Sequence, residues 1–173
     1  MNPRNVLSVV VITLLAAAPV PGVAQEIAID TGLIDACLAD ATADARETCI
    51  GVAARACTET PDGYTTAGMS ACFGQEHDWW DARLNAVYTE LLDLSQTFDA
   101  EMDALESHAP RLAPALREMQ RAWIPYRDAA CGYERAQWGG GTGGGPATWA
   151  CLMQMTSEQV LRLQARLDES RQQ

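Results

Sequence analysis

The sequence predicts an all-α protein: a small antiparallel helical bundle of three main helices plus one or two short N-terminal helices, pinned by disulfides. Three observations predict this class. Alanine, leucine, glutamate and arginine dominate after residue 24, with little strand-like alternation. Apolar residues then recur every three or four positions in long segments with short connections, which is typical of a bundle. Finally, six cysteines, an even number, follow a predicted export signal.

Residues 1–24 have the pattern of a signal peptide. Arg4 gives a positive start, residues 6–18 form an apolar run, and the small residues 22–24 suit a signal peptidase. The run has 13 residues, whereas a helix needs about 20 to span a bilayer. We therefore expect cleavage after Ala24, no membrane insertion of the mature chain, and a periplasmic or secreted location.

Short helices are expected at residues 31–38 and 43–57, followed by a loop at 58–68 with the turn sequence Pro61-Asp62-Gly63. A long helix should then span residues 69–106 and end at His108-Ala109-Pro110. The apolar stripe of this helix comprises Trp80, Leu84, Val87, Leu91, Leu94, Phe98, Met102 and Leu105.

The next predicted helix starts at residue 112 and contains Pro125, which should remove a backbone hydrogen bond and bend the helix. Its apolar face comprises Leu112, Leu116, Met119, Trp123, Tyr126, Ala130 and Tyr133. A glycine-rich loop at 139–145 follows, and Pro146 suits the first turn of a final helix that reaches about residue 168. The inner stripe of this helix comprises Trp149, Leu152, Thr156, Val160, Leu163 and Leu167.

The six cysteines are expected to form disulfides, because they follow an export signal. Metal binding usually needs paired Cys-x-x-Cys spacings with histidines nearby; no such spacing occurs, and the chain has two histidines. We therefore expect no metal and no cofactor. Sequence does not fix the connectivity of six cysteines. The preferred pairs, each of which closes a short predicted hairpin or loop, are Cys37–Cys49, Cys57–Cys72 and Cys131–Cys151.

The net charge of −11, with no lysine in the chain, argues against nucleic acid and anionic membrane surfaces as partners. It permits a basic protein partner, although net charge often serves solubility alone. Six acids and no base lie between Arg83 and Arg111. Arg111, Arg117 and Arg121 on the following helix are expected to match much of this run within the molecule.

Two motifs carry a family resemblance. The first runs from Trp80 to Tyr88 and reads WDARLNAVY; the second runs from Gln120 to Cys131 and reads QRAWIPYRDAAC. With the glycine loop, Cys151 and Thr156, they resemble the LprI-type lysozyme inhibitor family (LprI N-terminal-like domain). The resemblance covers residues 69–167. It divides the mature chain into a cysteine-bearing N-terminal helical extension, 25–68, and an LprI-like helical domain, 69–168.

This resemblance implies an exported, disulfide-bonded helical domain that inhibits lysozyme, a basic protein. The family often carries an arginine three residues after the threonine, where this chain has Gln159. The alternative hypothesis is a structural or stress-related envelope module that binds another protein. The motifs do not mark a contact surface, although Trp79 or Trp138 could anchor a partner, as exposed tryptophans often do.

The motif residues are interpreted as a structural network that joins two helices. Asp81 or Asn85 is expected to meet Arg127, because small bundles often fix their register with such a polar pair. The alternative is a carboxylate site of Glu76, Asp81 and Asp128. No nucleophile–base pair or acid pair stands out, so no catalytic residue is assigned and an enzyme is not expected. The network comprises Trp80, Asp81, Asn85, Tyr88, Gln120, Trp123, Tyr126, Arg127 and Asp128.

Overall fold

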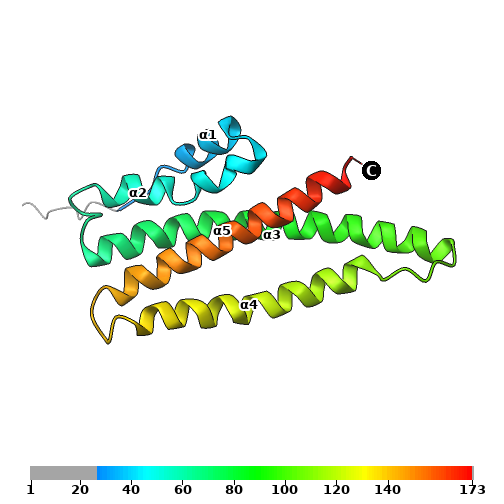
Figure 1. Ribbon diagram of the computed structural model, residues 1–173. Helices are drawn as coiled ribbons and strands as arrows, with labels where there is room; N and C mark the ends of the chain where they lie inside the picture. The colour runs from blue at the N-terminus through cyan, green and yellow to red at the C-terminus, as the bar shows by residue number, and fades with distance from the viewer. Residues whose placement is uncertain (1–26, 173) are drawn as a thin grey trace, which may run out of the picture.

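The computed structural model describes residues 27–172, so the signal peptide predicted for residues 1–24 lies outside the described residues. All the regular secondary structure of the described chain is helical, with no strand, which confirms the predicted all-α class (Figure 1). Its elements are α1 (Gly32–Asp40), the 3-10 helix η1 (Ala43–Cys49), α2 (Val52–Thr58), α3 (Thr66–Ala104), α4 (Leu112–Ala136) and α5 (Gly144–Ser170).

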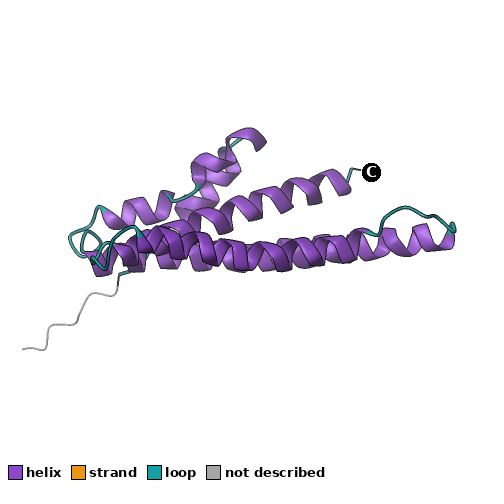
Figure 2. Cartoon of the chain, turned by 60° about the horizontal axis from the view of Figure 1, so that its bottom comes forward, coloured by secondary structure: helices purple, strands orange, loops and turns teal. Residues whose placement is uncertain are grey.

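The three long helices form the body of the molecule. α3 and α4 are antiparallel, and α5 returns across them with its most extensive contact on α3. The small elements α1, η1 and α2 pack on the side of α3 and α5 away from α4 (Figure 1). The end of α3 and the connection from α3 to α4 continue past the end of α5 as an arm, which is also visible in the turned view (Figure 2).

The hydrophobic core lies where α2, the first half of α3, and α5 meet. Full burial of a large apolar side chain stabilises the fold by about 1.5–3 kcal/mol relative to leaving it exposed. The largest fully buried apolar side chains come from α1, α3 and α5, namely Ile34, Trp80, Val160, Leu163 and Leu167.

The single helix predicted for residues 43–57 is wrong, because the chain divides it into η1 and α2. The break is at Gly51, whose φ of 79° lies in the left-handed region that glycine adopts without steric cost. The backbone N–H of Gly51 donates to the carboxylate of Glu76 on α3. A contact with a distant side chain therefore fixes the break.

The apolar stripe of α3 is buried only in its first half. Leu84 and Leu91 are 3% and 7% exposed, whereas Leu94, Phe98 and Leu105 are 37%, 39% and 72% exposed. The change coincides with the end of α5 at Ser170, which lines a groove together with Leu94 and Phe98. The second half of the stripe thus continues beyond the helix that covers the first half.

α4 turns a different face to the core from the one its apolar pattern indicates. Met119, Tyr126 and Tyr133 are exposed, and α4 continues without interruption across Pro125. This orientation places the polar side chains of Gln120 and Arg127 against α5, where both form hydrogen bonds. The buried and half-buried residues of α4 are Ala113, Leu116, Arg117, Gln120, Trp123, Arg127, Ala130 and Cys131.

Three disulfides connect successive elements, and the described residues contain no free cysteine. Cys37–Cys49 joins α1 to η1, Cys57–Cys72 joins α2 to α3, and Cys131–Cys151 joins α4 to α5. These pairs coincide with those preferred from the sequence. The disulfides therefore tie the elements together in three successive pairs, while no disulfide joins η1 to α2 or α3 to α4.

Two glycines of α3 offer a matched test of packing at its start. A Cβ on Gly68 would lie 2.0 Å from the carbonyl oxygen of Asp62, whereas one on Gly74 would lie 3.5 Å from Trp149 in ordinary contact. We expect Gly68→Ala to lower the free energy of unfolding by about 1–3 kcal/mol through overpacking. Gly74→Ala should not lower the free energy of unfolding, because alanine stabilises a helix interior by about 1 kcal/mol relative to glycine. Equal urea midpoints for the two variants would contradict the close approach at Gly68.

Candidate functional site

Glu76 is a fully buried carboxylate that holds α2 against α3. Its Oε1 accepts from the backbone N–H of Gly51 at 2.6 Å and from Trp80 Nε1 at 3.1 Å, while Oε2 accepts from the N–H of Ala54 at 2.7 Å. The first N–H groups of a helix have no partner within it, and α2 has no side-chain cap of its own. Glu76 therefore serves as the cap of α2, a role that the sequence analysis missed.

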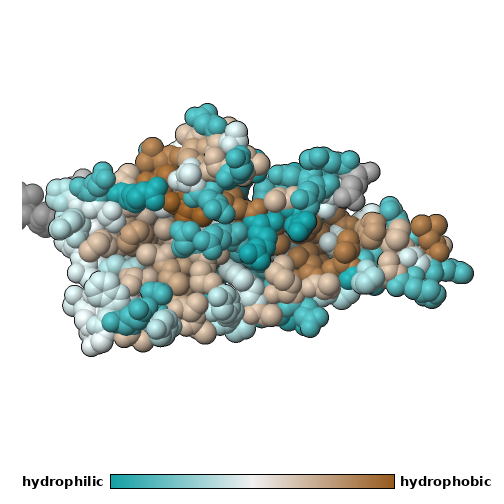
Figure 3. All heavy atoms as spheres, in the orientation of Figure 1, coloured by the Kyte–Doolittle hydropathy of each residue, from teal (hydrophilic) through white to brown (hydrophobic). Residues whose placement is uncertain are grey.

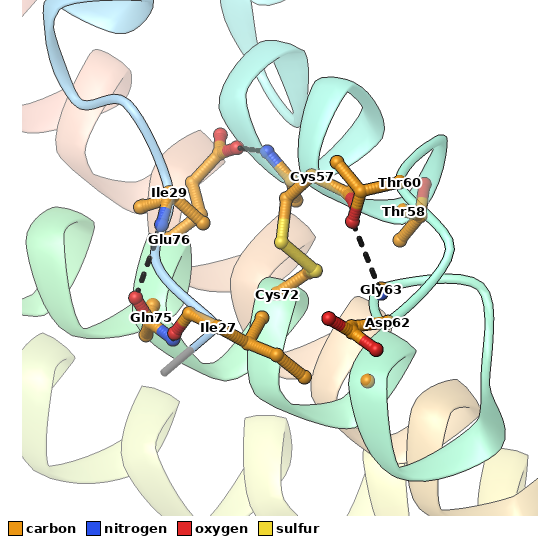
Figure 4. Close-up of a disulfide and its surroundings, with 12 residues drawn as sticks. Ile27, Ile29, Cys57, Thr58, Thr60, Asp62, Gly63, Cys72, Gln75 and Glu76 are labelled. Atoms are coloured by element: carbon orange, nitrogen blue, oxygen red, sulfur yellow. Dashed lines mark hydrogen bonds between the residues drawn. A yellow bond between two sulfur atoms is a disulfide. The ribbon is translucent and has the colours of Figure 1, made fainter. Parts of the chain in front are cut away.

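The neighbouring Gln75 fastens the segment before α1 in the same region (Figure 4). Its Nε2 donates to the carbonyl oxygen of Ile27 at 2.7 Å, and its Oε1 accepts from the N–H of Ile29 at 3.2 Å. The Cys57–Cys72 disulfide lies beside this pair of side chains. Gln75, Glu76 and Cys72, all in the first part of α3, thus hold the segment before α1, the start of α2 and the end of α2 respectively.

Asp99 repeats the capping arrangement at the other end of α3. Its two carboxylate oxygens accept from the backbone N–H groups of Leu112 at 2.7 Å and Ala113 at 2.9 Å, at the start of α4. Arg111 forms an ion pair with Asp103 and donates to the carbonyl oxygen of Ser107 at 3.0 Å. The connection between α3 and α4 is therefore held by charged hydrogen bonds.

The acidic run of α3 is matched less completely than the sequence indicates. Arg111 pairs with Asp103 as expected, and Glu90 pairs with Arg171 beyond α5. Within residues 27–172, neither Arg117 nor Arg121 takes part in an ion pair. The prediction that Arg117 and Arg121 form ion pairs with the acids of α3 is therefore wrong, because the main neighbour of α4 is α5 rather than α3.

Arg127 joins α4 to α5. Its guanidinium forms an ion pair with Asp128 at 2.8 Å, donates to Thr156 Oγ1 at 3.4 Å, and lies 5.0 Å from the ring centre of Trp123. Among the hydrogen bonds and ion pairs of the described chain, none joins Arg127 to the α3 positions that the sequence suggested. The interhelical partner of Arg127 is therefore Thr156.

The remaining motif residues fall into separate contacts. On α3, Asn85 Nδ2 donates to Asp81 Oδ2 at 3.1 Å, and Tyr88 is half-buried against the core. On α4, Gln120 Oε1 accepts from Gln159 Nε2 on α5 at 3.0 Å. Tyr126 is exposed. Within the two motifs, Trp80 lies in the core, Asp81 and Asn85 pair on α3, and Gln120 joins α4 to α5.

The three carboxylates of the alternative site have separate partners. Glu76 binds backbone N–H groups and Trp80, Asp81 binds Asn85, and Asp128 binds Arg127. Within the described ranges, no group of three histidine, cysteine, aspartate or glutamate side chains is arranged to hold a metal ion. The contacts of these carboxylates thus account for how the helices are joined.

The two tryptophans considered as anchors differ in exposure. Trp79 is half-buried, packs edge-on against Trp80 with ring centres 4.8 Å apart, and has the guanidinium of Arg83 5.6 Å from its ring centre. Trp138 is exposed at the end of α4, beside the glycine loop. The ring of Trp79 is thus partly covered by contacts within the molecule, whereas the ring of Trp138 is more accessible to a partner.

Replacing Arg127 tests its structural role. We expect Arg127→Leu to lower the free energy of unfolding by about 1.5–3 kcal/mol, because it removes the charged hydrogen bond to Thr156 on α5 together with the ion pair to Asp128. Arg121→Leu on the same helix should change it by less than about 0.5 kcal/mol, since this side chain is exposed. Urea unfolding of both variants makes the comparison. A melting curve unchanged by Arg127→Leu, with loss of partner binding, would assign the residue to recognition instead.

Fold and contacts together define a disulfide-bonded helical domain whose motif residues join its helices. The chain belongs to the lysozyme inhibitor LprI family, whose model matches residues 57–163. This result confirms the resemblance found in the motifs and extends it to Cys57, at the end of α2. The description of the family is that of a lysozyme inhibitor.

Two relatives are themselves uncharacterized. A protein of Rhizobium meliloti (strain 1021) is 26% identical over 102 residues, which cover 59% of this chain and 73% of the relative. A 17.7 kDa protein in the puhA 5' region of Rhodobacter capsulatus is 25% identical over 131 residues, which cover 75% of this chain and 81% of the relative. No solved structure matches the chain. No helix between residues 27 and 172 is long and apolar enough to cross a membrane.

Proposed function

We propose that this protein is an exported protein-binding module that inhibits lysozyme-type muramidases. The observation that carries the proposal is the match of residues 57–163 to the lysozyme inhibitor LprI family. The three disulfides support export, because such bonds form and persist outside the cytoplasm. On this proposal, residues 1–24 are a signal peptide, and the mature protein acts in the periplasm or outside the cell.

Inhibition by binding needs no reactive group on the inhibitor. A lysozyme hydrolyses its substrate with two carboxyl groups that flank the glycosidic bond in a cleft, so a bound protein that fills the cleft stops the reaction. The net charge of −11 favours association with a basic enzyme, because opposite charges increase the rate of encounter. The interaction should therefore weaken as the salt concentration rises.

The decisive experiment measures cell-wall lysis by purified c-, g- and i-type lysozymes in the presence of the oxidised mature domain. Dose-dependent inhibition of at least one type, with stronger inhibition at low salt, is the expected result. If all three enzymes remain fully active at a micromolar excess of the domain, the proposal is overturned. A periplasmic pull-down that recovers another protein and no muramidase would then favour an envelope-module role.

A further inference from the structure

The arm formed by the end of α3 and its connection to α4 has an apolar surface that the rest of the described chain leaves open. Leu94, Phe98 and Leu105 continue the helical spacing of the buried Leu84, Val87 and Leu91, but they lie beyond the end of α5. Leu112 at the start of α4 is also exposed, at 47%. Contiguous exposed apolar surface with a polar rim often marks a protein contact.

Leu94, Phe98 and Leu112 supply the apolar lining of an open groove of about 520 Å³. The space-filling view shows hydrophobic surface between the far parts of α3 and α4 (Figure 3). We name this surface the arm groove; it is lined by Leu94, Ser95, Thr97, Phe98, Glu101, Leu112 and Ser170.

The surroundings of the arm groove are acidic. Five acids lie on α3 and its C-terminal end between residues 93 and 106, with no base among them. Asp99 and Asp103 are engaged with α4 and Arg111. Glu101 lines the groove and Glu106 lies at the tip; both are exposed, and within residues 27–172 neither forms an ion pair. An apolar floor with a negative rim complements a partner surface with apolar side chains inside a positive rim.

We propose that the arm groove is the surface that binds the basic muramidase; this inference rests on the proposed function and assigns its contact site. The same charges disfavour a second copy of this chain as the occupant, because an isologous dimer would bring two identical acidic rims together. A basic enzyme removes that repulsion and gains the attraction of Glu101 and Glu106. The arm also extends past the rest of the molecule, which leaves it accessible to a partner (Figure 2).

Hydrogen bonds and an ion pair within the chain hold the tip of the arm. Asp99 caps α4, and the guanidinium of Arg111 bonds to Asp103 and to the carbonyl oxygens of Ser107 and Ala109. Holding a binding surface in one shape reduces the entropy lost on association. These bonds lie beside the groove and leave Glu101 and the apolar side chains available.

The test uses two groove variants and two matched controls in the full mature chain. Phe98→Ser removes an apolar contact, and Glu101→Arg reverses a rim charge. Tyr133→Ser and Glu134→Arg make the same chemical changes on exposed side chains at the opposite end of α4. Against the lysozyme type that the wild-type chain inhibits, the groove variants should raise the Kd by about tenfold or more. The controls should change it less than about twofold.

Circular dichroism melting first verifies that all four variants keep the wild-type fold; Glu101→Arg alters an exposed side chain, so it remains informative if Phe98→Ser destabilises the chain. If the wild-type chain inhibits a lysozyme and the folded groove variants bind as tightly as their controls, the groove assignment is overturned while the proposed function stands. If the wild-type chain inhibits none of the three types, both fail. If light scattering shows a dimer that Phe98→Ser dissociates, while lysozyme binding is unchanged, the occupant is a second copy and the assignment is wrong.

Discussion

Replacing Glu76 with alanine should lower the free energy of unfolding by about 3–5 kcal/mol, as expected when one partner of a buried, charged contact is removed. Glu76 is 0% exposed and accepts three hydrogen bonds. Without it, the backbone N–H groups of Gly51 and Ala54 stay buried and unpaired, and each costs about 1–3 kcal/mol. The left-handed turn at Gly51 also loses the contact that fixes it.

The expected change is large enough to read directly from a melting curve. In a domain of this size, 1 kcal/mol shifts the Tm by roughly 2–4 °C. A loss in the predicted range therefore lowers the Tm by roughly 6–20 °C. The Tm of Glu76→Gln should lie between those of wild type and Glu76→Ala, because the amide keeps one acceptor oxygen but points its own N–H donor at a buried backbone N–H donor.

Glu59→Ala is the matched control, since Glu59 is exposed at the end of α2. It should change stability by less than about 0.5 kcal/mol. Glu76→Ala should also loosen α2 in hydrogen exchange, while the amides at the middle of α5 keep their protection. A Tm within about two degrees of wild type, which corresponds to less than about 1 kcal/mol, would rule out the capping role of Glu76.

The features that sequence predicts well here are local. Helical spacing places the three long helices correctly to within a few residues, and Pro146 does lie in the first turn of α5. The break at Gly51 depends instead on Glu76, which lies 25 residues further along the chain. Helical periodicity cannot reveal such a contact, because a glutamate within an amphipathic helix has the same pattern whether it caps a distant helix or faces solvent.

Periodicity also does not say which neighbour covers an apolar stripe. The stripe of α3 has uniform spacing from Trp80 to Leu105, yet only its first half is buried, because the length of α5 sets the limit. On α4, the polar Gln120 and Arg127 face α5 in preference to the apolar Tyr126. Paired hydrogen bonds across helices decide that orientation, and their partners lie 29 and 39 residues away.

Reduction of all three disulfides should unfold the protein at 25 °C. The bonds span 12, 15 and 20 residues. Cross-links of this span each stabilise a fold by about 3 kcal/mol, mainly by restricting the unfolded chain. For separate loops these contributions add to about 9 kcal/mol, whereas domains typically have a total stability of about 5–15 kcal/mol.

Far-ultraviolet circular dichroism before and after reduction and alkylation measures this effect. The oxidised protein, treated with the same alkylating reagent, is the control, because none of the cysteines in residues 27–172 is free to react. Reduced protein that keeps its helical signal and a cooperative melting transition would contradict the prediction. It would show that the apolar core around Trp80 and Leu163 suffices without the cross-links.

The individual bonds should have different local consequences. α4 is the least buried long helix, with only Ala113 and Cys131 fully buried, so it depends most on its cross-link to α5. Changing Cys131 and Cys151 to serine should expose α4 to limited proteolysis while α3 and α5 remain protected. Changing Cys37 and Cys49 should instead release α1 and η1 and leave α4 resistant. Because the arm groove includes the first residue of α4, the Cys131 and Cys151 variant should also lose lysozyme inhibition, whereas the Cys37 and Cys49 variant should keep it.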